Sequence, residues 1–108
     1  MKILIFTISL LLLPIHSYGV PFDGSGKGKL GLVEVSGELP YSFMVRLVVE
    51  KPMCGPDTSK WAYVSQDDAN YNAFVSVILA TKLADKTVDI YSEKISPDKC
   101  KIVHIGFE

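Results

Sequence analysis

Histidine and cysteine, the side chains that most often bind metals or act in catalysis, are scarce in this sequence. The 108 residues contain two histidines and two cysteines, and only His104 among the histidines lies beyond the first nineteen residues. A zinc site needs three or four ligands at suitable spacing, which these residues do not supply. No group of residues combines a nucleophile, a base and an orienting partner. The sequence therefore predicts no enzyme, no metal site and no cofactor, with a small hydrolase that uses His104 as the remaining alternative.

An excess of basic residues is also absent. The formal net charge is −1, and Lys2 is the only charged residue among the first nineteen, so ten basic and twelve acidic residues follow it. Proteins that bind nucleic acid usually carry a basic excess or a basic stripe. No apolar run reaches the ~20 residues that a membrane-spanning helix needs. We therefore expect neither a nucleic-acid partner nor a membrane span.

The first nineteen residues have the three parts of a secretory signal peptide. Lys2 precedes an apolar run over residues 3–13, Pro14 ends it, and Ser17 and Gly19 are the small residues expected before a cleavage site. We expect residues 1–19 to be removed and the mature protein to be secreted or periplasmic. An uncleaved membrane anchor is the alternative. The remaining residues 20–108 suffice for one domain with one core.

The two cysteines predict one intramolecular disulfide, Cys54–Cys100, because exported chains of this size usually pair their cysteines. The bridge closes a loop of about 45 residues and contributes on the order of 4 kcal/mol in the chain-entropy model. Small domains have a free energy of unfolding of only about 5 kcal/mol. The bridge is therefore expected to supply a large share of the stability. Two free thiols or an intermolecular bond are the alternatives.

Five short segments have the composition of strands, and one has that of a helix. The strands are expected at residues 30–36, 43–50, 61–65, 87–92 and 101–107. The helix is expected over residues 69–84, with Ser65 or Asp67 as its N-cap. Residues 20–29 are rich in glycine and charge, so we expect a flexible lead before a single domain at residues 30–108.

The helix has two distinct faces. One carries an apolar stripe formed by Tyr71, Phe74, Val75, Ile78 and Leu79. The other is small and uncharged, and consists of Ala69, Ala73, Val77, Ala80 and Ala84. Because a surface helix usually carries charges on its outer side, this second face is a candidate surface for self-association. A solvent-facing helix built from good helix formers explains the same residues equally well.

The element order of three strands, one helix and two strands predicts a mainly β fold. It matches a five-stranded OB-type Greek-key barrel with its helix between strands 3 and 4, and an α+β sheet covered by one helix fits the same order. Trp61 and Tyr63 lie two apart on a strand and share one face. Such side chains suit sugars and protein partners, although a place for Trp61 in the core is the simpler expectation.

The C-terminal half resembles a known family. A cysteine precedes the aromatic strand WAYVSQDD, the segment ANYNAFVSVILATKLADKTVDIYS follows, and Cys100 comes before KIVHIGF. This pattern is similar to the small secreted family related to the B subunit of subtilase cytotoxin, with the closest match over residues 61–92. The resemblance implies an OB-type barrel, a ring of five copies, binding of sialylated glycans and a catalytic A subunit as partner. It assigns no ligand-binding residue to this chain.

Two functional hypotheses follow. The first is a secreted, non-catalytic binding module that binds glycans and forms oligomers in the manner of a toxin B subunit. The second is a monomeric periplasmic or extracellular accessory or inhibitor protein that binds another protein.

Overall fold

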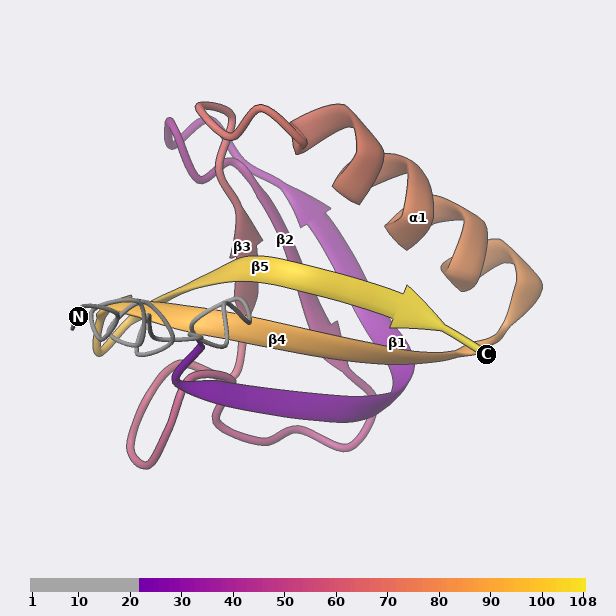
Figure 1. Cartoon of the computed structure of the whole chain (residues 1–108), viewed down its shortest axis with the longest axis horizontal. Coiled ribbons are helices and arrows are strands. Elements are labelled where there is room, and N and C mark those ends of the chain that lie inside the picture. The colour runs from indigo at the N-terminus through magenta and orange to yellow at the C-terminus, as the bar shows by residue number, and fades with distance from the viewer. Residues whose placement is uncertain (1–21) are drawn as a thin grey trace, which may run out of the picture.

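Five strands close into a ring around one core in the computed structural model, which describes residues 22–108. The elements are β1 (Gly24–Val35), β2 (Phe43–Leu47), β3 (Ala62–Val64), α1 (Tyr71–Ala84), β4 (Thr87–Ser96) and β5 (Lys99–Phe107). Around the ring the strands follow the order β1-β2-β3-β5-β4, and β4 returns to β1 (Figure 1). With α1 between β3 and β4, the predicted OB-type order is confirmed. The expected signal peptide lies outside the described residues.

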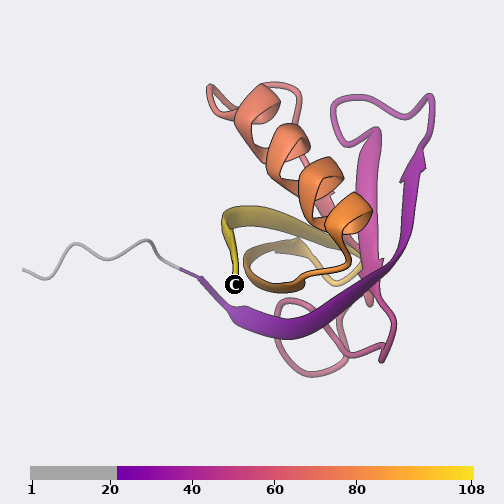
Figure 2. The ribbon, with the colours of Figure 1, turned by 90° about the vertical axis from the view of Figure 1, so that its right-hand side faces the viewer.

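A bend in β1 allows the sheet to close. The first half of this strand pairs with β4, from Gly24 opposite Ser92 to Lys29 opposite Thr87, and the second half pairs with β2. Figure 2 shows β1 sweeping around the sheet between these two partners. The expectation of a flexible lead is therefore wrong for residues 24–29. Their glycines are not typical of strands, so the sequence did not predict this half of β1. The glycines permit close packing, since a Cβ on Gly26 would lie 3.0 Å from a methyl group of Leu47.

The core is aliphatic and is filled by the inward side chains of all five strands and by α1. Its buried members are Leu30, Phe43, Val45, Leu47, Met53, Cys54, Ala62, Val64, Ile78, Val88, Ile90, Cys100 and Ile102. The expected core position of Trp61 is wrong. Because Ala62 and Val64 point inward, Trp61 and Tyr63 lie on the outer side of the strand and are half-buried.

The predicted disulfide is present. Cys54 and Cys100 are bonded with a Cα–Cα distance of 5.5 Å, and both residues are buried. The bond joins the connection between β2 and β3 to the start of β5. It lies next to the parallel β3–β5 pairing, which has only two residue pairs. This disulfide is compatible with a secreted or periplasmic protein.

Helix α1 covers part of the ring and begins two residues later than predicted. Its N-cap is Asn70, which makes no side-chain capping hydrogen bond, so the prediction of Ser65 or Asp67 is wrong. Those residues instead form the preceding turn, in which the hydroxyl of Ser65 accepts a hydrogen bond from the amide of Asp67 at 3.1 Å. The helix ends at Ala84, and its C-cap Asp85 adopts the left-handed conformation.

The apolar stripe of α1 faces the core, with one exception. Tyr71, Phe74 and Val75 pack against the core and Ile78 is buried in it, whereas Leu79 is 45% exposed. No helix within residues 22–108 has both the length and the apolar character needed to cross a membrane.

Candidate functional site

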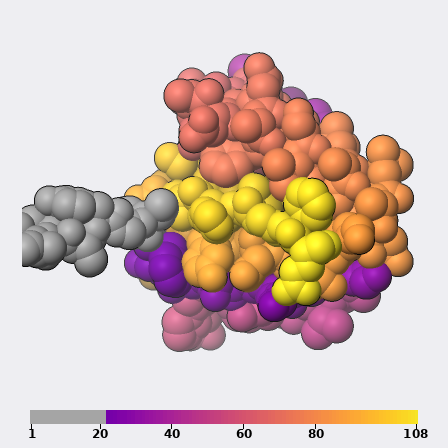
Figure 3. Space-filling model, turned by 45° about the vertical axis from the view of Figure 1, so that its right-hand side comes forward, coloured from indigo at the N-terminus to yellow at the C-terminus, as the bar shows by residue number. Residues whose placement is uncertain are grey.

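A shallow groove lies on the outer face of the ring, where the first half of β1, β4 and β5 run side by side. The strand registers place outward side chains in rows. Lys27 of β1 lies opposite Asp89 of β4, which in turn lies opposite Gly106 of β5. In the next row, Tyr91 lies between Ser25 and His104. Figure 3 shows β5 in yellow, with orange atoms of β4 and the indigo start of β1 beneath it.

The groove exists because its central position lacks a side chain. A Cβ placed on Gly106 would meet no atom within 4 Å, so the space above this residue is open. The resulting hollow has a volume of about 250 Å³. Its lining consists of Lys27, Thr87, Val88, Asp89, Tyr91, His104, Gly106, Phe107 and Glu108.

A register shift in the β4–β5 pairing turns His104 toward the groove. Tyr91 pairs with His104 and Ser92 with Ile102, which leaves Val103 as an additional residue in β5. Ile102 is therefore buried and Ile105 packs against the core, although they are three residues apart. The two residues between them lie outside the core, and His104 is exposed. His104, the one histidine among residues 22–108, is thus a surface side chain.

Three aromatic rings line up at the end of the groove. Tyr91 contacts His104 on one side, with ring centroids 5.2 Å apart, and Phe22 on the other, at 4.8 Å; both pairs are edge-to-face. One backbone hydrogen bond fixes Asp23, the residue next to Phe22. The amide of Asp23 donates to the carbonyl of Ser92 at 2.8 Å. Because Phe22 is 50% exposed, the row presents an accessible apolar surface beside polar groups.

An ion pair bounds the other end of the groove. The Lys27 ammonium lies 2.9 Å from Oε2 of Glu108 and bridges β1 to the residue that follows β5. The hydrogen bond from Lys27 lowers the pKa of the Glu108 carboxyl. The same bond, with a smaller contribution from Asp89, raises the pKa of Lys27. Both side chains are largely exposed, so this pair defines the rim more than it stabilises the fold.

Four polar side chains in the groove have no partner among residues 22–108, and one of them is the hydroxyl of Thr87. Asp89, Tyr91 and His104 make neither a side-chain hydrogen bond nor an ion pair there, whereas Asp23 accepts a bond from the Lys94 amide at 2.7 Å. A carboxylate accepts hydrogen bonds, and a phenol and a neutral imidazole each donate and accept. The groove therefore presents donors and acceptors beside an aromatic surface, which is an arrangement suited to a small polar ligand.

A second outer surface, which we call the aromatic face, lies across β2 and β3. It is formed by Tyr41, Met44, Arg46, Trp61, Tyr63 and Lys99. The Arg46 guanidinium lies over the ring of Trp61 at 4.8 Å, and the Lys99 ammonium lies over the ring of Tyr63 at 4.5 Å. The predicted shared face of Trp61 and Tyr63 is thus confirmed.

Carboxylates hold the cations of the aromatic face over its rings. Lys99 donates to Oε1 of Glu38 at 2.9 Å, and Arg46 lies 3.4 Å from Glu50. The hydrogen bond to Glu38 raises the pKa of Lys99. Because each cation already has a carboxylate and covers a ring, this face offers fewer open polar groups than the groove.

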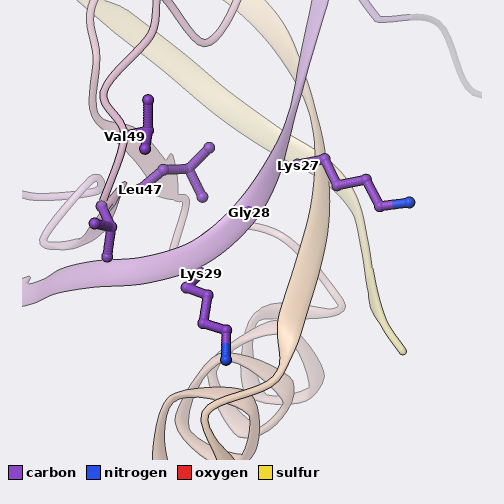
Figure 4. Close-up of a pocket in the computed structure, with 6 residues that line it drawn as sticks. Lys27, Gly28, Lys29, Leu47 and Val49 are labelled. Atoms are coloured by element: carbon purple, nitrogen blue, oxygen red, sulfur yellow. The ribbon is translucent and has the colours of Figure 1, made fainter.

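A third hollow lies where β1 bends past the end of β2, and its volume is also about 250 Å³. Figure 4 shows Leu47 and Val49 on one side of β1 and the lysine side chains extending away from them. The Lys29 ammonium is occupied by Asp85 at 3.0 Å. The lining is mostly apolar, and both of its lysines, Lys27 and Lys29, are paired with carboxylates.

The uncharged second face of α1 lies at the surface. Ala73, Ala80 and Ala84 are exposed and Val77 is half-buried, whereas Ala69 is exposed in the turn before the helix, so its predicted place on the helix is wrong. Leu83 extends this surface and is 87% exposed. Within residues 22–108, no group of three histidine, cysteine or acidic side chains is arranged to hold a metal ion.

The sequence did not identify the groove as a ligand site. Its residues come from three strands whose register is set by the fold, and its central position is defined by a missing side chain. The one sequence signal is the alternation VDIYS, which places Asp89 and Tyr91 on the same side of β4.

No family model matches the chain, no curated protein is similar enough to match, and no solved structure matches.

Proposed function

We propose that this chain is a secreted, non-catalytic carbohydrate-binding module and that one sugar residue binds in the groove above Gly106. The observation that carries the proposal is the set of unpartnered polar groups beside an aromatic row. Hydroxyl groups of a sugar would satisfy Asp89, Tyr91 and His104, and the apolar side of the sugar ring would contact the aromatic rings. The resemblance to the toxin B-subunit family favours the same class of ligand.

The size of the groove supports a single sugar residue as its occupant. Pockets for drug-sized ligands usually have volumes of about 300–1,000 Å³. The groove, at about 250 Å³, is smaller and open to solvent. A longer glycan would extend past its rim across the outer face of the strands. We expect weak binding of each sugar residue, with dissociation constants near the millimolar range.

The experiment is an NMR titration of the mature protein with methyl glycosides of glucose, galactose, mannose and N-acetylglucosamine. Binding should shift the backbone resonances of Tyr91, His104 and Gly106. The variant Gly106→Val fills the groove, and because a Cβ at this position meets nothing, the fold should remain intact. It should abolish those shifts, and Tyr91→Ala should weaken binding about tenfold.

The matched control is Trp61→Ala, which alters the aromatic face and leaves the groove unchanged. Under the proposal, Trp61→Ala retains the shifts at Tyr91 and His104. A glycan response that disappears in Trp61→Ala and survives in Gly106→Val would move the site to the aromatic face. The absence of any response to the glycosides, together with no signal on a glycan array, would contradict carbohydrate binding.

We further propose that α1 mediates self-association, with five copies as the resemblance implies. The exposed alanine surface with Leu79 and Leu83 is apolar, and burying it would remove that area from water. Ala73→Glu or Ala80→Glu should reduce the mass measured by light scattering to that of a monomer. A monomeric mass for the unmodified protein at high concentration would contradict this part of the proposal.

The alternative is a monomeric accessory or inhibitor protein, and the aromatic face favours it. Tyr, Trp, Met and Arg are the residues enriched at the centres of protein interfaces, with charged residues at their rims. Tyr41, Met44, Arg46 and Trp61 have this composition, and Glu38 and Glu50 lie at the edge. A protein captured from the native host that binds the unmodified chain and not Trp61→Ala would favour this second function.

A further inference from the structure

The electric charge of the groove has a direct consequence for ligand choice. It contains one ammonium group, from Lys27, and two carboxylates, from Asp89 and Glu108. Lys27 is already bound to Glu108 at 2.9 Å. The Asp89 carboxylate is half-buried and has no hydrogen-bonding or ionic partner among residues 22–108. The charge left uncompensated in the groove is therefore negative.

Other nearby cations do not change this balance. Lys29 follows on the same side of β1, but its ammonium is held by the side chain and the carbonyl of Asp85, at 3.0 and 2.7 Å. On the far side of Tyr91, Lys101 lies 3.9 Å from Glu93. Each of these cations has its own carboxylate, so neither is free to neutralise Asp89.

We infer that the groove selects uncharged and amine-bearing sugars over acidic sugars, and that Asp89 is the residue that determines this selectivity. This inference rests on the proposed carbohydrate-binding function for its class of ligand. A ligand carboxylate in the groove would face Asp89 across a few ångströms, and the two like charges would repel each other. A ligand hydroxyl or ammonium at the same place would donate a hydrogen bond to it.

Lys27 is not free to offset the repulsion between Asp89 and a ligand carboxylate, because it is already paired with Glu108. A ligand carboxylate could bind this ammonium only by displacing Glu108, so one ionic contact would be exchanged for another of similar strength. The hydroxyl of a neutral sugar needs no such exchange. Selectivity of this kind is the opposite of what the resemblance to sialic-acid-binding B subunits implies.

The test uses pairs of ligands that share a sugar ring and differ in whether they carry a carboxylate. One pair is a methyl hexoside and the corresponding methyl uronide, and the other is a methyl sialoside and its methyl ester. Dissociation constants from NMR titration at low ionic strength should favour the neutral member of each pair by roughly three- to tenfold. The ratio should approach one in 0.5 M salt, because salt screens exposed charges.

The variant Asp89→Asn should bring the ratio close to one even at low salt. Glu34→Gln is the matched control, since it removes the same charge from β1 at an exposed residue outside the groove, without taking a carboxylate from any of the lysines near the groove. It should preserve the ratio. Using the ratio within each variant removes any general effect of the substitution on affinity.

The outcomes separate this inference from the function on which it rests. Tighter binding of the acidic members, or a preference that persists in Asp89→Asn, overturns the role of Asp89 and leaves carbohydrate binding standing. Equal affinities for the neutral and acidic ligands at low salt in the unmodified protein would also overturn the role of Asp89 without contradicting carbohydrate binding. Lack of response to every neutral and acidic ligand overturns carbohydrate binding, and the selectivity inference with it.

Discussion

Gly24 lies so close to Cys54 that a Cβ atom on the glycine would be 2.7 Å from the Cα of the cysteine. The same Cβ would be 2.7 Å from the backbone nitrogen of Gly55. The start of β1 therefore packs directly on the backbone of the β2–β3 connection, at the residue that carries the disulfide.

Gly24→Ala should accordingly destabilise the protein by about 2–3 kcal/mol, because the neighbouring atoms are backbone and cannot move aside cheaply. Urea unfolding followed by far-UV circular dichroism measures the change. Gly106→Ala is the control, since its Cβ meets nothing, and it should stay within about 0.5 kcal/mol of the unmodified protein. Equal effects at the two glycines would refute this account of β1.

Removal of the disulfide should cost a larger amount. We expect Cys54→Ala/Cys100→Ala to lower the free energy of unfolding by about 2–5 kcal/mol, since the bond spans 46 residues of sequence separation. Adding a reductant should lower the urea midpoint of the unmodified protein to about that of the double variant. The midpoint of the double variant itself should not change. A midpoint of the unmodified protein that does not respond to complete reduction would disprove the expected contribution.

Ser92 should be replaceable by alanine without loss of stability. Its hydroxyl is fully buried and has no hydrogen-bond partner among the described residues. Because an unsatisfied buried hydroxyl costs free energy, Ser92→Ala should be neutral or stabilising by about 1 kcal/mol. Thr81→Ala is the comparison. Because the buried Thr81 hydroxyl donates a hydrogen bond to the carbonyl of Ile78 at 3.0 Å, this substitution should lower the stability. Thermal melts of both variants decide the matter, and a destabilised Ser92→Ala protein would point to a partner for this hydroxyl.

The Lys27–Glu108 pair should respond to pH in a defined direction. Its hydrogen bond lowers the pKa of Glu108 below the ordinary 4.5, so the favourable interaction is fully present above that pH and is lost as the pH falls through the lowered value. A ¹³C NMR titration of the Glu108 carboxyl should give a midpoint below 4.5, and Lys27→Gln should return it toward 4.5. An identical midpoint in both proteins would mean that the pair does not persist in solution.

The sequence was most informative where one periodicity dominated. The apolar stripe from Tyr71 to Ile78 located α1 to within two residues. The alternation that begins at Phe43 located the start of β2, although the strand ends at Leu47 and not at residue 50 as predicted. The pairing of Cys54 with Cys100 followed from their number. These features depend on local pattern or on counting, which a single sequence records.

The features that the sequence did not reveal depend on close packing between distant segments. Residues 24–29 lack strand-forming side chains because backbone and core atoms occupy the space beside Gly24 and Gly26. Ala62 lies between Val45 and Cys100 and points into the core. Its neighbour Trp61 therefore points to the outer side of the strand. The groove likewise depends on the register of three strands and on a shift in β5, so its residues could not be grouped in advance.

The pairing between β3 and β5 is the shortest in the ring, so we expect the sheet to open there most easily. Only two residue pairs join these strands, whereas β4 and β5 pair along most of their length. The sulfur–sulfur bond at Cys100 fastens this short contact covalently. If the disulfide were reduced, β3 and β5 would be expected to separate before the other strand pairs. Their exposed edges could then pair with strands of other copies. Formation of the Cys54–Cys100 bond would therefore lower the risk of aggregation through these edges.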